Sequence, residues 1–193
     1  MSRFRQAVFP IENRELKKFV PFALIIFITV FNFTQLRNLK DALVLTAPES
    51  GGEVLSYLKS LVVMPTAILI NAMYIKMRAT KSFRSSYNIV VGVFLVFFAL
   101  FVFVINPNVD FLHASPETIA AYKASFPRVQ FMFPMFGNWG YSLFYVAAEM
   151  WGTVCLSVLF WQFANDNIGT HEAKRFYPAF LFFNAFATFL VGT

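Results

Sequence analysis

Charged residues are scarce in this chain, at 13% of 193 residues, which is about half the share usual in soluble domains. Apolar residues make up 58% of the sequence, and phenylalanine alone occurs 27 times. A soluble protein of this length has too little interior to bury so much apolar surface. The composition therefore excludes an ordinary soluble domain and predicts an all-α polytopic membrane protein.

Cysteine and histidine are too few for most covalent or metal chemistry. Cys155 is the single cysteine, so no internal disulfide can form, and its apolar surroundings indicate a packing role. The two histidines lie far apart and have no partners at metal-ligand spacing. The sequence also lacks phosphate-loop, dinucleotide-binding, serine-hydrolase and zinc-protease motifs. We therefore expect no metal, no cofactor, no nucleic-acid partner and no enzymatic activity.

Five apolar runs are long enough, or nearly so, to cross a bilayer as helices. Without a small-x-small cleavage site, the first run is expected to remain as an anchor. The predicted helices follow a leader at residues 1–18 and cover about residues 19–46, 54–77, 85–106, 139–165 and 176–193. Since the last run has no polar exit, we expect this chain to be the front part of a longer one.

Lysine and arginine are unevenly distributed among the connections. The leader is rich in them, and the connection after the second run has basic residues without any acidic one. These basic residues are Lys76, Arg78, Lys81 and Arg84. The first and third connections mix both signs of charge. By the positive-inside rule, this pattern predicts that the N-terminus and the 76–84 connection lie in the cytoplasm.

Two of the apolar runs contain a single charge, Glu149 and Lys59. An ionisable residue at the centre of a span costs about 2.5–3.5 kcal/mol, so such residues usually face a bundle interior or a wet cavity. Ser142, Tyr145 and Thr153 share the helix face of Glu149, which is typical of a lined pathway. A structural ion pair between helices would also explain Glu149, and snorkelling to the interface would explain Lys59.

The stretch FNFTQLRNLKDAL carries three more charged residues, Arg37, Lys40 and Asp41. If the first helix ended before them, at Leu36, they would be ordinary surface charges. The apolar residues that follow allow it to continue to about Thr46, which would turn Arg37 and Lys40 inward. A bidentate guanidinium and a compact ammonium both suit phosphate oxygens. Asp41 could hold Arg37 in place between ligands.

Four segments of the chain match, in the same order, segments of a known transporter family. They are KKFVPFALIIFITVFNFTQLRNLKDAL, GGEVLSYLKSLVVMPTAI, NWGYSLFYVAAEMWGTVCLSVLFWQFAN and EAKRFYP. Together they resemble the ATP/ADP translocase, or nucleotide transporter, family of intracellular bacteria and plastids. The resemblance implies about twelve helices in a major-facilitator-like arrangement of two bundles around a central site. This chain would supply most of the N-terminal bundle and would lack the C-terminal half.

The resemblance also implies a substrate and a site. In that family the lysine of the LRxxKD stretch and the glutamate of the AExWG stretch are associated with transport, and they match Lys40 and Glu149. Arg37, Asp41 and Lys59 match family positions as well. The expected activity is exchange of ATP for ADP, or uptake of related nucleotides, across the inner membrane of a bacterium. The chain reads LRNLKD where the family pattern is LRDTKD, which leaves nucleotide identity and coupling open.

Our hypothesis from the sequence is alternating access, with the phosphate tail meeting Lys40 and Arg37 and with Lys59 near the cavity mouth. Tyr145 would be a further substrate contact. Glu149 could pair with a cation in the empty state, accept a hydrogen bond from the nucleotide, or titrate if protons drive uptake. The alternatives are a structural or assembly subunit of a membrane complex and a proton-coupled importer of another phosphorylated metabolite. A membrane-embedded enzyme would need a nucleophile, or a base and metal pair, which the sequence does not show.

Overall fold

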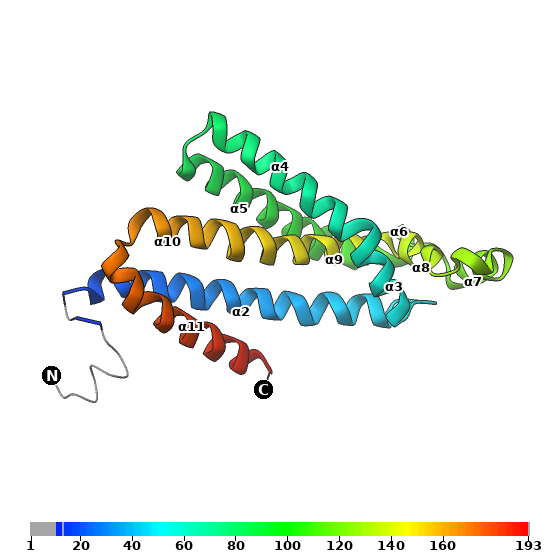
Figure 1. The fold of residues 1–193 in the computed structure, drawn as a ribbon. Coiled ribbons are helices and arrows are strands. Elements are labelled where there is room, and N and C mark those ends of the chain that lie inside the picture. The colour runs from blue at the N-terminus through cyan, green and yellow to red at the C-terminus, as the bar shows by residue number, and fades with distance from the viewer. Residues whose placement is uncertain (1–10, 13, 193) are drawn as a thin grey trace. The chain divides into compact units, whose positions relative to one another are not determined.

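The computed structural model describes residues 11–12 and 14–192, and every regular element among them is a helix (Figure 1). The predicted leader at residues 1–18 lies mostly outside these residues. The longer α-helices are α2 (Leu16–Thr46), α4 (Met64–Thr80), α5 (Phe83–Leu100), α9 (Trp139–Trp151) and α11 (Thr170–Gly192). The shorter ones are α3 (Gly52–Tyr57), α6 (Val109–Leu112), α7 (Pro116–Ser125), α8 (Met132–Gly137) and α10 (Trp161–Asn167).

Several of these helices continue into one another, which gives five segments long and apolar enough to cross a membrane. They are Leu16–Thr46, Gly52–Thr80, Phe83–Leu112, Trp139–Asn167 and Thr170–Gly192. Apolar runs form helices in lipid because a helix satisfies all of its backbone hydrogen bonds internally. The prediction of five long apolar helices, each able to cross a membrane, is thus confirmed.

Two π-helical segments directly precede prolines inside these spans. Leu58–Val63 comes before Pro65, and Phe101–Ile105 comes before Pro107. A proline has no N–H to donate and its ring clashes with the carbonyl four residues earlier. The wider π turn moves that carbonyl away, so the chain passes each proline while staying helical. A third π-helical segment, Gly152–Phe160, joins α9 to α10 without a proline.

Two helices begin three or more residues earlier than predicted, because charged residues that resemble connections are held on these helices by ion pairs and hydrogen bonds. Helix α2 starts at Leu16, and Lys18 in its first turn donates to the Glu172 carboxylate at 2.5 Å. Pro21 consequently lies inside the helix rather than in its first turn. Helix α11 starts at Thr170, six residues before the predicted start, because Glu172 also accepts a hydrogen bond from the Gly169 amide at 3.0 Å.

The connection between the third and fourth spans contains helices that the sequence analysis did not predict. Ser115 caps α7 by accepting from the Thr118 amide at 3.3 Å, and Ile119 buries its side chain. Lys123 on the same helix donates to the carboxylate and to the carbonyl of Glu49, at 2.8 and 2.9 Å. Such short helices lack the long apolar period that reveals a span, so pattern alone does not identify them.

The chain divides into two compact units. Unit 1 comprises Met1–Gln35 and Val154–Thr193, and unit 2 comprises Leu36–Thr153. The divisions fall within α2 and within the π-helical segment that follows α9.

The core of unit 1 is aromatic. Phe19 of α2 is 2% exposed, stacks on Phe180 of α11 at 5.4 Å between ring centroids, and meets Phe176 edge-on at 5.2 Å. Phe22 stacks on Phe163 at 4.9 Å. Such offset and edge-on pairs add about 0.5–1.5 kcal/mol each beyond the burial of their area. Aromatic contacts thus hold α2 and α11 side by side in this unit (Figure 1).

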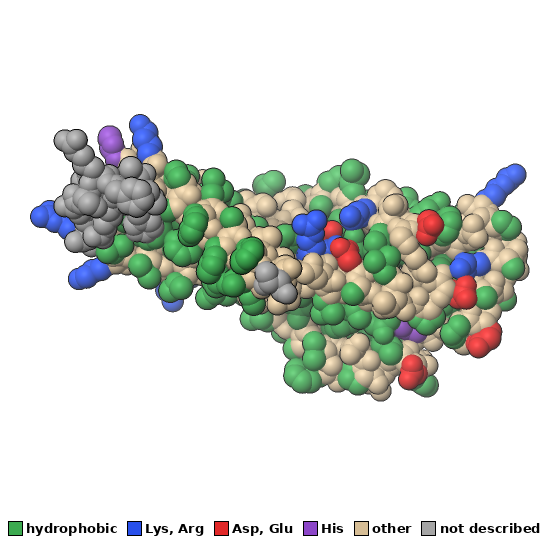
Figure 2. All heavy atoms as spheres, turned by 90° about the horizontal axis from the view of Figure 1, so that it is seen from below, with side chains coloured by type: hydrophobic (Ala, Val, Ile, Leu, Met, Phe, Trp, Pro, Cys, Tyr) green, Lys and Arg blue, Asp and Glu red, His purple; other side chains and the backbone are tan. Residues whose placement is uncertain are grey.

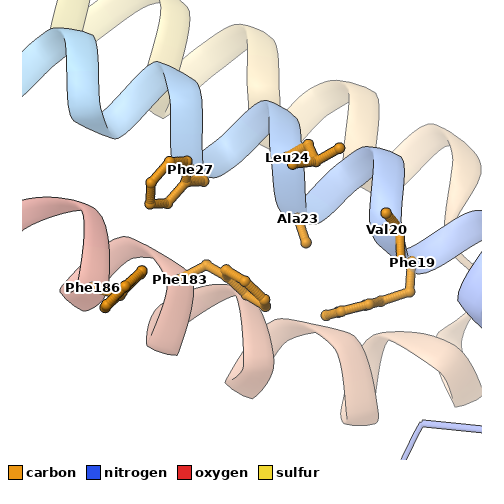
Figure 3. A pocket seen from close by; sticks show the side chains of 7 residues that line it. All are labelled: Phe19, Val20, Ala23, Leu24, Phe27, Phe183 and Phe186. Carbon is orange, nitrogen blue, oxygen red and sulfur yellow. The ribbon is translucent and has the colours of Figure 1, made fainter.

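An apolar groove of about 240 Å³ lies between α2 and α11 in unit 1. Figure 3 shows that its walls come from both helices, with aromatic rings from each turned into the gap. The lining residues are Phe19, Val20, Ala23, Leu24, Phe27, Phe183 and Phe186. Since all of these side chains are apolar, the groove does not suit an anion.

The core of unit 2 brings α2, α3, α5 and α9 together. Tyr145 of α9 is fully buried in one cluster with Val44 of α2 and Val54 of α3. Phe144 forms a second cluster with Phe101, whose ring centroid is 4.3 Å away. Adjacent residues of α9 therefore pack in two different clusters, which fixes the rotation of this helix about its axis.

Candidate functional site

Lys40 of α2 is buried in unit 2 although it carries a charge, with 1% of the residue exposed. Its Nζ lies 2.7 Å from the Asp41 carboxylate and 3.1 Å from the Glu149 carboxylate of α9. A buried ammonium is tolerated only when it is paired and hydrogen-bonded, and these two oxygens meet that need. Lys40 thus joins two membrane-spanning helices through charge.

Tyr145 provides the third contact of this ammonium. The Lys40 Nζ lies 3.9 Å from the centroid of the Tyr145 ring, within the range of a cation–π interaction. The Tyr145 hydroxyl is buried and makes no hydrogen bond of normal geometry with the described residues. Buried hydroxyls usually have a partner, and the charged group beside this one is the Lys40 ammonium.

The sequence places Tyr145 and Glu149 one helical turn apart, so both reach the same side of α9. The other polar residues of the predicted stripe are engaged elsewhere. Ser142 donates to the Met135 carbonyl at 2.7 Å, and Thr153 donates to the Glu149 carbonyl at 3.1 Å. Of the four polar residues predicted to share one face of α9, only Tyr145 and Glu149 contact Lys40 in the described structure.

Arg37 lies one turn before Lys40 on α2 but is exposed. It forms no ion pair or hydrogen bond with any residue that the structure describes. The expectation that both cations turn inward thus holds for Lys40 and not for Arg37. Asp41 pairs with Lys40 instead of holding Arg37 as expected. Lys40 and Asp41 are adjacent in the sequence, so their side chains can reach each other. Arg37 instead lies on the exposed side of α2.

Lys59 is exposed in the π-helical segment Leu58–Val63 and has no ion pair with any residue that the structure describes. Figure 2 shows basic and acidic side chains next to one another on the face that it displays. A place for Lys59 at the mouth of a cavity remains a prediction.

The start of α9 is anchored by residues that the sequence analysis did not single out. Asn138 is 3% exposed and donates to the carbonyls of Pro48 and Pro134, both at 3.0 Å. Trp139 donates through its indole N–H to the Leu112 carbonyl at 2.8 Å. The sequence feature that could have indicated these anchoring contacts is the polar, glycine-containing segment NWGY at the start of the fourth span. Its partners are distant in the sequence, so the pattern did not reveal them.

A metal centre has no support in residues 11–12 and 14–192, where no three histidine, cysteine, aspartate or glutamate side chains come together. The cluster around Lys40 consists of this lysine, the carboxylates of Asp41 and Glu149 and the phenol of Tyr145, and the exposed Arg37 lies one turn earlier on α2. Ionisable groups inside membrane helices usually mark the path of an ion or a substrate. The fold therefore defines a polytopic helical membrane protein with a cluster of charged and polar side chains among its helices.

Comparison with known proteins identifies the family. The profile of the TLC ATP/ADP transporter family matches residues 1–193, and the chain belongs to this family. It is 39% identical over 180 residues to ADP,ATP carrier protein 1 of Rickettsia bellii, covering 93% of this chain and 36% of that protein. It is 40% identical over 177 residues to ADP,ATP carrier protein 3 of Rickettsia conorii, covering 92% of this chain and 35% of that protein.

The chain spans about a third of the length of these curated relatives. No solved structure shows significant similarity to it.

Proposed function

We propose that this chain forms part of a secondary transporter that exchanges ATP for ADP across a bacterial inner membrane by alternating access. The observation that carries the proposal is Lys40, buried within a membrane-spanning helix between two carboxylates and a tyrosine ring. Membership of an ATP/ADP transporter family and relatives named ADP,ATP carrier proteins support the substrate.

Lys40 is the group that binds the phosphate tail. In the empty site its ammonium is shared by Asp41 and Glu149. A nucleotide carries several phosphate oxygens with delocalised charge, and these compete for the same ammonium. The Glu149 contact is the longer of the two carboxylate contacts, so it is the one that yields first. The displaced Glu149 and the Tyr145 hydroxyl can then bond the base or the ribose.

Arg37 makes the first contact with the arriving nucleotide. It is exposed, without a partner among the described residues, and one turn from Lys40. A guanidinium binds phosphate bidentately and needs no rearrangement of an existing ion pair here. The phosphate tail passes from Arg37 to Lys40 as the cavity closes, with Lys59 near the mouth.

Exchange rather than free uptake follows from the cost of closing an empty site. Without nucleotide, closure would bury Arg37 without a counter-charge, which is strongly unfavourable. Bound phosphate removes this cost, so the loaded carrier reorients and the empty one does not. A substrate of the same charge class is then needed for the return step.

The remaining parts of the proposal concern the whole transporter. We place the N-terminus and the basic 76–84 connection in the cytoplasm, because Lys76, Arg78, Lys81 and Arg84 have no acidic neighbour. The architecture is a major-facilitator-like pair of bundles. In a carrier of the relatives' length, the residues beyond the matched region supply the other half of the cavity.

Counterflow in vesicles tests this function. The complete carrier is reconstituted and loaded with unlabelled ATP, ADP, another nucleotide, or none, and uptake of labelled ATP and ADP is measured. We expect rapid uptake only into vesicles loaded with ATP or ADP. Absence of exchange with every nucleotide would refute the proposal. Uptake into empty vesicles under an imposed proton gradient would instead support a proton-coupled importer.

A further inference from the structure

His113 connects the end of α6 to the start of α9. It follows α6 directly, and its Nε2 accepts a hydrogen bond from the Gly140 amide at 3.2 Å. The His113 ring meets the Tyr141 ring edge-on at 4.8 Å between centroids. A Cβ at position 140 would lie only 2.7 Å from this nitrogen, so a glycine is needed for so close an approach.

This hydrogen bond satisfies an amide that the helix itself leaves unpaired. The first N–H groups of any helix have no partner within it. In the first turn of α9, the Tyr141 and Ser142 amides both donate to the Asn138 carbonyl, whereas the Gly140 amide donates to His113. His113 therefore caps the first turn of α9 from outside the helix.

The bond exists only while His113 is neutral. Nε2 accepts a hydrogen bond as long as it carries no proton, and the proton of the neutral ring then resides on Nδ1. An imidazolium has donors at both nitrogens. It would repel the Gly140 N–H and also place a positive charge at the positive end of the α9 dipole. Protonation therefore converts an attraction at the start of α9 into a repulsion.

Helix α9 transmits this change to Lys40, because Tyr145 and Glu149 lie on the same helix five and nine residues after Gly140. Building on the proposed function, we propose that His113 is a positioning residue of the Lys40 site. In its neutral form it holds the first turn of α9 in place, and its protonation releases that turn and lowers nucleotide exchange.

The local charges set the direction of the pH effect. Burial lowers the pKa of His113 below its ordinary value of 6.5, and the nearby Asp110 carboxylate on α6 opposes this shift. Tyr141 is the titratable side chain of α9 packed against the ring. A lowered pKa means that folding favours the neutral form, so this contribution to stability is complete above pH 6.5. It is lost as the pH falls below that value.

Three variants of the complete carrier test this assignment through exchange rates between pH 5 and 8. The parent should lose about two- to tenfold of its rate on acidification, the range expected for one hydrogen bond. His113→Gln keeps an acceptor that does not titrate, so its profile should be flatter than that of the parent. His113→Ala should be slow at all pH values. His171→Gln changes the other, exposed histidine and should keep the parent profile.

The nucleotide also titrates in this pH range, but it does so equally with every variant. The ratio of the variant's exchange rate to that of the parent at each pH therefore reports the effect of His113 alone. The inference is overturned if His113→Gln keeps the acid dependence of the parent. A second readout is independent of transport. Amide hydrogen exchange of the first turn of α9, compared between parent and His113→Gln at the same pH, should be faster in the parent at pH 5 and equal at pH 8.

Equal exchange in the two proteins at pH 5 would refute the role of His113 even if transport fails for other reasons. If the hydrogen-exchange difference is found in a carrier that moves no nucleotide, the proposed function fails while the positioning role at α9 stands.

Discussion

The two units place their charges differently. In unit 1 the ion pairs lie near the start of α2 and of α11, where Lys18 contacts Glu172 with side chains 38% and 26% exposed. Arg175 there pairs with Glu15 and, at 3.5 Å, with Glu12. In unit 2 the Lys40 side chain is only 2% exposed and is held inside the helix cluster. Both units thus contain a lysine–glutamate pair whose glutamate is about one quarter exposed, but only the Lys40 side chain is buried.

The two arrangements differ in their energetic cost. Partly exposed ion pairs contribute about 0–1 kcal/mol and cost little to form. A buried pair has to offset the desolvation of both ions, and apolar residues of similar size often replace it without loss of stability. Unit 1 is stabilised by its phenylalanines and needs no internal charge. The buried Lys40 of unit 2 is therefore the basis of the binding site proposed above.

Lys40→Ala should have the largest effect on transport. It removes the ammonium proposed to bind phosphate and leaves the partly exposed Asp41 and Glu149 without their cation. A hydrogen bond to a charged group contributes about 1.5–3 kcal/mol, and the ammonium can make several to phosphate, so we expect exchange in reconstituted vesicles to fall at least about hundredfold. Lys18→Ala is the matched control in unit 1 and should stay within about twofold of the parent. Normal uptake by well-inserted Lys40→Ala would remove Lys40 from the site.

Phe19→Ala should lower stability strongly without changing substrate affinity. The ring is 2% exposed and packs on Phe176 and Phe180, and such truncations cost about 3–5 kcal/mol. Thermal unfolding in detergent should show a clearly lower midpoint, while the KM for nucleotide stays that of the parent. Phe182→Ala, at a side chain 68% exposed, should change the midpoint little. A raised KM in Phe19→Ala would contradict the separation of roles between the units.

Glu149→Gln should have an intermediate effect. The amide keeps the shape of the side chain but removes one of the two negative charges at Lys40, while Asp41 still pairs with the ammonium. Hydrogen bonds to charged groups contribute about 1.5–3 kcal/mol, so we expect exchange to fall about ten- to hundredfold. Glu172→Gln in unit 1 is the control and should leave the rate nearly unchanged. The two glutamates are about equally exposed, at 25% and 26%, so equal behaviour of the two variants would show that the contact with the buried Lys40 gives Glu149 no special role.

Arg37→Ala should have the smallest effect. Arg37 is exposed and has no ion pair with the described residues, so its loss leaves no buried charge unpaired. We expect a KM raised about three- to tenfold at low salt, a smaller change at high salt, and a nearly normal maximum rate. Arg128→Ala, at an exposed arginine of the third connection, should leave the KM unchanged. A lost maximum rate with an unchanged KM would argue against first contact through Arg37.

The sequence pattern was sufficient to predict the long apolar helices and to single out the charged residues within them. In lipid, a long apolar run forms a helix because this satisfies all of its backbone hydrogen bonds within the run. The five long apolar helices could therefore be predicted from the sequence. Lys40 and Glu149 were singled out because ionisable residues are rare in such runs. Helix starts were less predictable. The start of α11 at Thr170 depends on Glu172, whose partner Lys18 is 154 residues away in the chain.

By itself, the amino-acid sequence determined that this protein crosses a membrane as helices and that a few charges lie within them, because local composition decides both. Only the tertiary structure decided which charges meet. It pairs Lys40 with Asp41 and Glu149, leaves Arg37 exposed, and joins His113 to the start of α9. The physical reason is that the partner of a buried charge depends on how helices pack around it. That packing is set by contacts between residues far apart in the chain.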